Sequence, residues 1–348
     1  MKKHYHFVFL SNTPSFYKLN LCRELAKSHS LLLVLLGYGS EAVNQAPEQE
    51  PFDVVFLHAG DLHRRPKCRV FFRLLRLMHR ISADRILFSG WFVPEFNLFS
   101  FLSTKQKNAL ICESSVLDSS LSGLKGWVKR RIMHRMSAAL PSGKPHRELF
   151  ERMGFNGSVH TTGSVGLIRY SPRVLRTETR RPLRYLFVGR LIPVKNVLML
   201  AQAFKRNGKP LTIVGTGPLE QDIRKLHAPH ITLTGFIPNE QLHAVYQEHD
   251  VFILPSLYEP WGLVVEEALY HGLPVIVSDK VGCAWDMVAE TQTGIIFQAD
   301  SMQALQTAIF QMEQKPEFYR RNVLQLCWEN RKKKQLDAYR NLQAHTDP

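Results

Sequence analysis

The sequence predicts an α/β protein built from two Rossmann-like domains, each with a parallel sheet covered by helices. Short apolar runs of strand length alternate with helix-length segments along the whole chain, a pattern typical of parallel sheets. The runs fall into two sets of about six, separated by a polar segment with two prolines. A length of 348 residues also suits about two domains.

The first set of apolar runs predicts six strands before the polar segment. They are His6–Leu10, Leu31–Leu36, Val54–Leu57, Arg85–Phe88, Ala109–Cys112 and Ala138–Leu140. We read residues 169–183 as the interdomain linker, because they lack periodicity. Six further strands are expected after it: Arg184–Val188, Leu211–Val214, Ile231–Leu233, Val251–Leu254, Pro274–Val277 and Ile295–Phe297.

Composition points to a soluble globular enzyme, with 45% hydrophobic and 10% aromatic residues. No apolar run approaches the ~20 residues that a membrane-spanning helix needs. The apolar stretch Phe7–Leu10 is too short for the core of a signal peptide. The five cysteines are scattered and odd in number, so we expect reduced thiols in a cytoplasm, without a disulfide framework or zinc site.

The net charge of +15 lies mainly in the first half, where residues 1–170 hold 24 Lys and Arg against 12 Asp and Glu. The spacing of five arginines predicts one basic stripe on a helix over His63–Ile81: Arg65, Arg69, Arg73, Arg76 and Arg80. A second basic cluster surrounds Trp127: Lys125, Lys129, Arg130, Arg131 and Arg135. Such surfaces suit an anionic membrane, and the alternative is a solvated helix face that aids solubility.

The most informative segment is 258–268, Tyr-Glu-Pro-Trp-Gly-Leu-Val-Val-Glu-Glu-Ala, which follows an expected buried strand. Glu259 and Glu267 flank a predicted helix start. There the N–H groups of Gly262, Leu263 and Val264 have no intrahelical acceptor, so they attract phosphate. The two carboxylates would repel an anion and are better suited to hydroxyl groups. A ligand with phosphates between hydroxyl-rich rings is a nucleotide sugar.

This segment resembles the Glu-x7-Glu motif of retaining glycosyltransferases of the GT-B fold, in glycosyltransferase family 4, known as group 1. The resemblance is strong over residues 184–300 and extends to transferases of bacterial surface polysaccharide and lipopolysaccharide. It implies two parallel sheets facing a central cleft. It also implies that Glu259 lies at the donor sugar as a catalytic residue and that Glu267 binds the ribose hydroxyls.

The resemblance also assigns the domains. It implies that residues 1–168 bind the acceptor and that 184–330 bind the nucleotide sugar. The C-terminal helix and tail at 331–348 can return to the first domain, as the last helix of such proteins often does.

A second matching motif is Gly189-Arg190-Leu191, followed by Lys195, at the end of an expected strand. The resemblance implies that Arg190 and Lys195 bind the donor diphosphate and that Gly189 lets the backbone approach it. Fixed cations of this kind stabilise the charge that develops on a leaving diphosphate. The sequence has no Asp-x-Asp pair, so we expect a metal-independent reaction with no metal and no cofactor.

Two further loops complete the expected donor site. Gly215 and Gly217 follow the next strand and fit close approach of the backbone to a ligand. Phe236 and Ile237 follow the strand after that, and the resemblance places this loop beside the nucleobase. The alternative in each case is a loop packed for structural reasons alone.

The acceptor side is less informative. Lys18 lies in a glycine-free first turn and could offer charge, although a solvent-exposed lysine is an equal alternative. Glu113 ends an expected strand, where it could bind the acceptor or handle a proton, or could make only structural hydrogen bonds.

Together these observations predict a cytoplasmic, metal-independent retaining hexosyltransferase, with peripheral attachment to the inner face of the plasma membrane as an open alternative. The expected donor is a UDP-sugar in preference to a GDP-sugar, and the expected acceptor is a glycan or lipid-linked glycan. One alternative is an epimerase of the same fold acting on the nucleotide sugar. Another is a basic nucleic-acid-binding protein, but no zinc finger, RNA-recognition or helix-turn-helix pattern occurs and both glutamates would lack a role.

Overall fold

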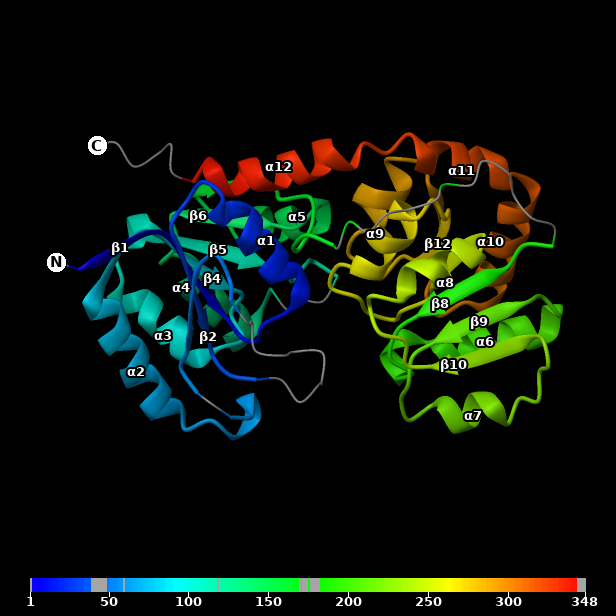
Figure 1. The fold of residues 1–348 in the computed structure, drawn as a ribbon, viewed down its shortest axis with the longest axis horizontal. Coiled ribbons are helices and arrows are strands. Elements are labelled where there is room, and N and C mark those ends of the chain that lie inside the picture. The colour runs from blue at the N-terminus through cyan, green and yellow to red at the C-terminus, as the bar shows by residue number, and fades with distance from the viewer. Residues whose placement is uncertain are drawn as a thin grey trace. The chain divides into compact units, whose positions relative to one another are not determined.

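The computed structural model describes residues 2–38, 49–58, 60–117, 119, 121–168, 170, 175 and 182–342. Its contacts divide the chain into two compact units, Met1–Arg169 with Glu329–Pro348 (unit 1) and Tyr170–Trp328 (unit 2). The expected linker 169–183 lies outside the described residues, except for residues 170, 175, 182 and 183. Figure 1 shows the elements of both units.

Unit 1 contains one parallel sheet in the order β3-β2-β1-β4-β5-β6-β7. Its strands are β1 (Lys3–Ser11), β2 (Leu31–Leu35), β3 (Asp53–Phe56), β4 (Ile81–Ser89), β5 (Asn108–Cys112), β6 (Ala138–Pro141) and β7 (Ser158–Val159). All six expected strands are present. The sequence did not predict β7, because two residues are too short to produce an apolar pattern.

Helices cover both faces of this sheet. On one face lie α2 (Lys67–Arg80), α3 (Pro94–Leu102), α4 (Gly123–Met133) and α5 (Lys144–Arg152), which share a core with Val8, Leu10 and Phe88. On the other face α1 (Phe16–Ala26) and α12 (Trp328–Arg340) pack against Phe7 and Phe9. Two short 3₁₀ turns, η1 (Leu62–Arg64) and η2 (Lys105–Lys107), complete the unit.

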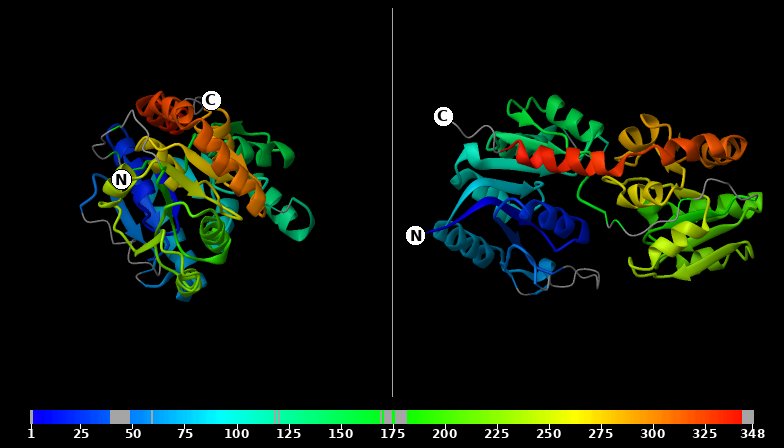
Figure 2. Two further views of the ribbon diagram at one scale, coloured as in Figure 1. Left: turned by 90° about the vertical axis from the view of Figure 1, so that its right-hand side faces the viewer. Right: turned by 45° about the horizontal axis from the view of Figure 1, so that its top comes forward.

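Helix α12 is the last helix among the described residues, yet it packs against the first sheet (Figure 2). Leu336, Tyr339 and Leu342 are buried in the core beside α1. Lys332 Nζ forms an ion pair with Glu24 at 3.1 Å, and Arg85 Nε donates a hydrogen bond of 2.6 Å to the carbonyl oxygen of Leu342. Unit 1 is therefore assembled from two distant parts of the sequence.

Unit 2 contains a second parallel sheet in the order β10-β9-β8-β11-β12-β13. Its strands are β8 (Tyr185–Val188), β9 (Leu211–Val214), β10 (Ile231–Gly235), β11 (Val251–Leu254), β12 (Val275–Ser278) and β13 (Gly294–Phe297), so the six expected strands are confirmed. Its helices are α6 (Val197–Asn207), α7 (Glu220–Arg224), α8 (Leu242–Glu248), α9 (Leu263–Tyr270), α10 (Met302–Gln314) and α11 (Pro316–Leu324), with the short turns η3 (Pro193–Lys195) and η4 (Ala284–Ala289).

The expectation of one arginine stripe over His63–Ile81 is wrong at its start. Helix α2 begins at Lys67, after Pro66, so Arg65 lies outside the helix. The Arg65 guanidinium instead forms a bidentate ion pair with buried Glu95, with Nε–Oε1 at 2.8 Å and Nη2–Oε2 at 3.0 Å. Arg73 also donates to the carbonyl oxygen of Leu57 at 2.9 Å. Two of the five arginines therefore support the fold of unit 1.

The five cysteines are free thiols, as expected, and three of them are buried. Within the described ranges, no helix combines the length and apolar character that crossing a bilayer requires.

Candidate nucleotide-sugar site

The strand order of unit 2 places two of the predicted motifs next to each other. The chain builds β8, β9 and β10 outward in one direction and then returns to add β11 on the other side of β8. In open α/β sheets, ligands bind beyond the carboxyl ends of the strands at such a reversal. The loop after β8 carries Arg190 and Lys195, and the loop after β11 carries Glu259 and Gly262.

Backbone hydrogen bonds connect these loops to each other and to the loop after β12. Leu257 N donates to Val194 O at 2.8 Å. Glu259 N donates to Lys280 O at 3.1 Å, and Gly282 N donates to Glu259 O at 2.9 Å. The backbone of Glu259 is therefore held on both sides, which fixes where its side chain begins.

The structure brings Lys195 and Glu259 into direct contact. The Lys195 ammonium forms an ion pair with Glu259 Oε2, and both side chains are largely buried, at 16% and 14% exposure. Arg190, in contrast, is exposed at the same strand end. A largely buried cation and carboxylate at the switch point form a polar site whose charges are already oriented.

Gly262 lets the chain turn from the Glu259 loop into α9. Its φ of +104° is rarely accessible to residues with a side chain. A Cβ atom here would also lie 3.0 Å from Val281 Cγ1 and 3.3 Å from Cys283 Sγ. Helix α9 then begins at Leu263, so the N–H groups of Leu263 and Val264 precede the intrahelical ladder and are available to an anion.

Glu267 lies in the second turn of α9, where Tyr246 of α8 positions it. The Tyr246 hydroxyl donates to Glu267 Oε2 at 3.1 Å, and the Tyr246 ring stacks on His271 with centroids 5.2 Å apart. Burial raises the pKa of the Glu267 carboxyl to about 7, and the charge of Glu266 adds to the rise, although the Tyr246 hydrogen bond opposes it. Sequence reasoning missed Tyr246, since its pattern is that of an ordinary core residue.

The raised pKa makes the stability of the donor-free protein depend on pH. The folded state favours the neutral Glu267 carboxyl. The contribution of this carboxyl to the free energy of unfolding is therefore fully present below about pH 4.5, and it is lost as the pH rises through about 7. We expect Glu267→Gln, which stays neutral, to gain thermal stability relative to wild type between pH 5 and pH 8. The gain should be on the order of 2–3 kcal/mol. A stability difference that stays constant over this range would contradict a buried, proton-binding Glu267.

A buried pair beside this carboxylate fixes the start of α9. Trp261 and Glu266 are 2% and 5% exposed, and Trp261 Nε1 donates to Glu266 Oε1. Glu266 therefore points toward the Trp261 loop, while the neighbouring Glu267 bonds to Tyr246. The sequence gave no sign of the hydrogen bond between Trp261 and Glu266.

Gly215 and Gly217 have a packing role in unit 2. A Cβ on Gly215 would lie 2.0 Å from the carbonyl oxygen of Gly189, and one on Gly217 would lie 2.5 Å from that of Leu191. The two glycines therefore let the loop after β9 approach the loop after β8. Their contact with a donor stays a prediction.

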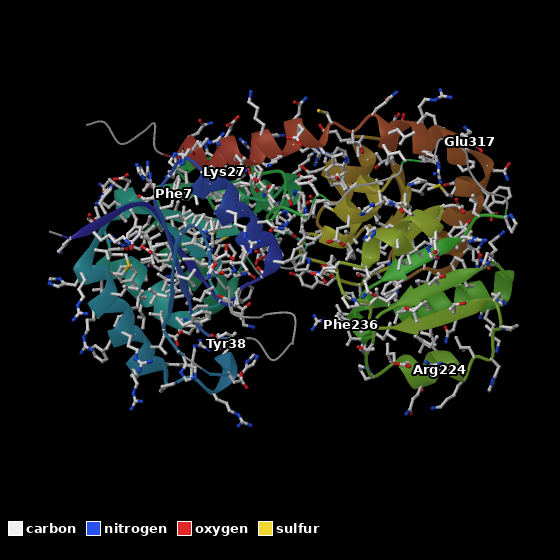
Figure 3. All side chains as sticks on the ribbon, in the orientation of Figure 1. Phe7, Lys27, Tyr38, Arg224, Phe236 and Glu317 are labelled. Atoms are coloured by element: carbon white, nitrogen blue, oxygen red, sulfur yellow. The ribbon has the colours of Figure 1, made fainter. Side chains whose placement is uncertain are left out.

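The expected nucleobase loop lies at the margin of this sheet. Phe236 follows β10, the edge strand, and its side chain is 61% exposed (Figure 3). Ile237 beside it is half-buried. Two strands, β9 and β8, separate this loop from the strand that leads to Glu259.

Unit 1 has a comparable reversal of strand order between β1 and β4. Glu113, which follows β5, pairs with Lys18 of α1 at 3.3 Å. Burial opposes the charge on Lys18, but Glu113 outweighs it and raises the pKa of the ammonium above its ordinary value. With 18% of its side chain exposed, Lys18 is therefore a largely buried ion-pair partner, and the solvent-exposed alternative is wrong.

Unsatisfied polar atoms gather near this reversal in unit 1. Ser11 ends β1 and Asn12 follows it, and Ser89 ends the adjacent β4; the atoms concerned are Ser11 Oγ, Asn12 Oδ1 and Ser89 Oγ. Each is buried without a hydrogen-bond partner in the described part of the chain. Buried polar atoms are normally paired, so these are candidate contacts for a polar ligand. The sequence gave no signal for them, because single Ser and Asn residues are common in turns.

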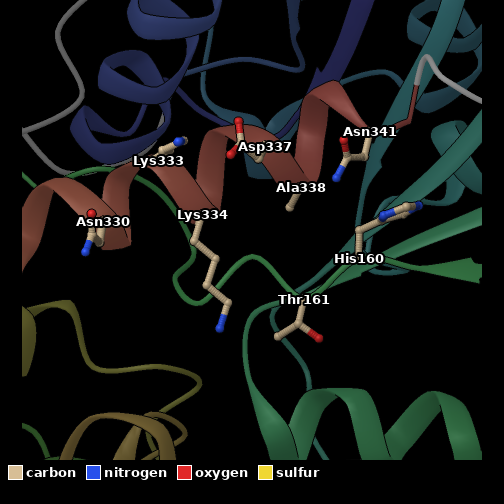
Figure 4. A pocket seen from close by; sticks show the side chains of 8 residues that line it. All are labelled: His160, Thr161, Asn330, Lys333, Lys334, Asp337, Ala338 and Asn341. Atoms are coloured by element: carbon tan, nitrogen blue, oxygen red, sulfur yellow. The ribbon is translucent and has the colours of Figure 1, made fainter.

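A cavity of about 430 Å³ lies elsewhere in unit 1, between α12 and the segment after β7 (Figure 4). Lys334 extends from α12 toward Thr161 in this view. The residues that line it are His160, Thr161, Asn330, Lys333, Lys334, Asp337, Ala338 and Asn341. No predicted site residue is among them.

Comparison with known proteins agrees with this arrangement. Residues 176–323 match the family model described as glycosyl transferases group 1. A GDP-mannose-dependent alpha-mannosyltransferase of Mycolicibacterium smegmatis is 35% identical over 41% of this chain and 39% of its own length. An O-antigen chain mannosyltransferase B of Escherichia coli is 27% identical over 45% of each protein. The matches thus span less than half the length of these two relatives.

The fold comparison covers nearly the whole chain. A sucrose-phosphate synthase structure from Thermosynechococcus elongatus superposes with a TM-score of 0.71 and 18% identity, covering 98% of this chain and all of the other. At this identity the likeness concerns the fold. Residues 176–323 therefore resemble the glycosyl transferases group 1 family, and the chain has the GT-B fold.

Proposed function

We propose that this protein is a glycosyltransferase that moves a hexose from a nucleotide sugar to a glycan or lipid-linked glycan in surface polysaccharide or lipopolysaccharide synthesis. The observation that carries the proposal is the Lys195–Glu259 ion pair at the switch point of unit 2, beside the start of α9. The family of residues 176–323 and the polysaccharide-related name of the Escherichia coli relative support it.

The geometry suggests how the donor binds. The diphosphate fits against the N–H groups of Leu263 and Val264, with Arg190 as the exposed cation at the mouth of the site. Lys195 lies on the Glu259 side, where the phosphate joins the sugar. Glu267, held by Tyr246, accepts hydrogen bonds from the ribose hydroxyls.

The proposed reaction retains configuration and uses no metal. The acceptor oxygen bonds to the anomeric carbon as the bond from that carbon to the phosphate oxygen breaks. The acceptor proton passes to the departing phosphate on the same face of the sugar. In this mechanism Lys195, Arg190 and the α9 amides stabilise the charge that develops on the diphosphate, as fixed cations and amide dipoles do.

The acceptor is proposed to bind unit 1. Glu113 and Lys18 form a fixed charge pair there, and Ser11, Asn12 and Ser89 offer hydrogen-bonding atoms near the adjoining strand ends. Hydroxyl and amide groups with spare hydrogen-bonding capacity suit a glycan.

The donor base has two candidates, a UDP-sugar and a GDP-sugar. The Mycolicibacterium smegmatis relative, which is 35% identical, is a GDP-mannose-dependent mannosyltransferase, and GDP-mannose is therefore the second candidate beside the UDP-hexose predicted above. A thermal-shift panel of UDP-, GDP- and ADP-hexoses with the purified protein separates them, because a specific donor raises the melting temperature more than its competitors.

The activity itself is tested by incubating the selected donor with glycan and lipid-linked glycan acceptors in EDTA. A hexose-sized mass increase on an acceptor supports the proposal. A changed nucleotide sugar with no modified acceptor would favour the epimerase alternative. Activity that requires added Mn²⁺ or Mg²⁺ would contradict the metal-independent mechanism.

Glu267→Ala is expected to raise the donor KM by roughly tenfold to a hundredfold, because a charge-assisted hydrogen bond contributes about 1.5–3 kcal/mol. The control is Glu290→Ala, which removes an exposed acid from the same unit. An unchanged donor KM in steady-state assays would remove Glu267 from the ribose site.

A further inference from the structure

Two neighbouring helices of unit 1 expose apolar side chains to solvent. Helices α3 and α4 pack on the same face of the sheet and contact each other. In α3, Leu98, Phe101 and Leu102 are 57%, 47% and 64% exposed. Their spacing of three and one places them on one helical face, which here is turned away from the core.

Helix α4 repeats this pattern. Leu124, Trp127 and Val128 have the same spacing and are 76%, 53% and 41% exposed, while Ile132 and Met133 are buried. Phe92, just before α3, adds a ring that is 72% exposed. We call these seven side chains the α3–α4 apolar face. A surface helix normally shows water its polar side, and a group of exposed apolar residues marks an interaction surface.

Basic residues surround this face and exposed acids are scarce. Within the described part of residues 92–135, the acidic side chains are Glu95 and Glu113, and each is ion-paired inside unit 1. The basic side chains of the same segment are Lys105, Lys107, Lys125, Lys129, Arg130, Arg131 and Arg135. Helix α2, on the other side of α3, adds exposed Arg69, Arg76 and Arg80.

Hydrogen bonds connect the two helices, and a cation–π contact lies within α4. Arg135, just beyond α4, donates to the carbonyl oxygens of Ser100 and Ser103 at 3.1 and 3.0 Å, which connects it to the end of α3. The Arg131 guanidinium lies 5.2 Å from the Trp127 ring centre. The exposed apolar residues therefore lie on two helices that are joined by hydrogen bonds, and the Arg131 guanidinium lies against the Trp127 ring.

We propose that the α3–α4 apolar face docks on a lipid bilayer containing anionic lipid. The choice of partner rests on charge complementarity: aliphatic and aromatic side chains enter the boundary between headgroups and acyl chains, while surrounding Lys and Arg contact anionic headgroups. Trp127 beside Arg131 matches the preference of indole rings for the membrane–water interface. The exposed arginines of α2 lie on a helix that contacts α3 and buries Val70 and Leu74 in the core.

Flotation with vesicles tests the docking. Wild-type protein should bind phosphatidylcholine vesicles that contain phosphatidylglycerol at about 0.1 M salt. It should bind more weakly at about 1 M salt, where the Debye length falls from about 10 to 3 Å. Leu98→Asp combined with Leu124→Asp should weaken binding at least about tenfold, because it places charges in the apolar layer. The matched control is Phe310→Asp, on α10 of unit 2, where the native ring is 61% exposed.

Spectroscopy gives a second readout that does not depend on the aspartate variants folding. Brominated phosphatidylglycerol should quench the tryptophan fluorescence of wild-type protein, and Trp127→Phe should lose most of this quenching while still floating with the vesicles. Retained quenching in Trp127→Phe would overturn the proposed orientation. Equal binding to neutral and anionic vesicles, or none to either, would overturn the proposal.

Further outcomes distinguish two other partners for the α3–α4 apolar face. A concentration-dependent dimer that the double aspartate variant abolishes, with no vesicle binding, would assign the face to a second copy of the chain. Binding to single-stranded nucleic acid in place of vesicles would assign it to that partner. Either result overturns membrane docking without affecting the proposed glycosyl transfer, which the assay with a glycan acceptor tests without vesicles.

Discussion

Lys195→Ala is expected to reduce kcat by about a hundredfold to a thousandfold, with a smaller change in the donor KM. Removing one preoriented donor to a developing negative charge commonly has this effect. Lys195 is 16% exposed and lies against Glu259, so water replaces its charge poorly once the side chain is truncated. The measurement is initial rate against donor concentration, with acceptor saturating and EDTA present.

The matched control is Lys225→Ala, which removes an exposed lysine of unit 2 whose partner is Asp222. Because Lys195→Ala also leaves the Glu259 carboxylate without this cation, thermal unfolding should accompany the rates. A folded Lys195→Ala enzyme with wild-type kcat would exclude Lys195 from stabilising the leaving group.

Glu259→Gln is expected to have a similar effect on kcat, because it keeps the size of the side chain and removes its charge. The proposed position of Glu259 at the donor sugar predicts a loss of about a hundredfold at saturating donor. Wild-type turnover under these conditions would make the assigned role wrong. Since Lys195 and Glu259 touch, we expect the double variant to lose less activity than the product of the single losses.

The strands and the two motifs of the candidate donor site could be predicted because they depend on local sequence. A buried parallel strand such as β11 (Val251–Leu254) is apolar throughout, and Gly262 marks the sharp turn that follows it. The rule that ligands bind at strand carboxyl ends then places Lys195 and Glu259 at one edge. Their direct contact depends on the tertiary fold, and the spacing of residues in the sequence does not predict it.

The supporting residues could not be predicted for the same reason. Tyr246 reaches Glu267 from a different helix, and Trp261 reaches Glu266 only because the chain turns at Gly262. Such hydrogen bonds depend on how helices pack, and an isolated tyrosine or tryptophan in the sequence indicates burial alone.

Periodicity also does not reveal which helical face meets the core. Leu98, Phe101 and Leu102 have the spacing of a buried stripe, yet they face solvent while Phe96 and Phe99 are buried. The prediction of a helical arginine stripe failed at Arg65 because Pro66 precedes the helix. Arg65 therefore lies in a non-helical segment, from which it reaches Glu95.

The return of α12 to unit 1 has a consequence for the order in which the protein folds during synthesis. Unit 2 is continuous in sequence, so its sheet can close as soon as residues up to β13 have left the ribosome. The core of unit 1 lacks Leu336, Tyr339 and Leu342 until the last described helix emerges. Unit 1, although translated first, must wait with one face of its sheet partly uncovered, and it is the unit most exposed to chaperones or to aggregation at that stage.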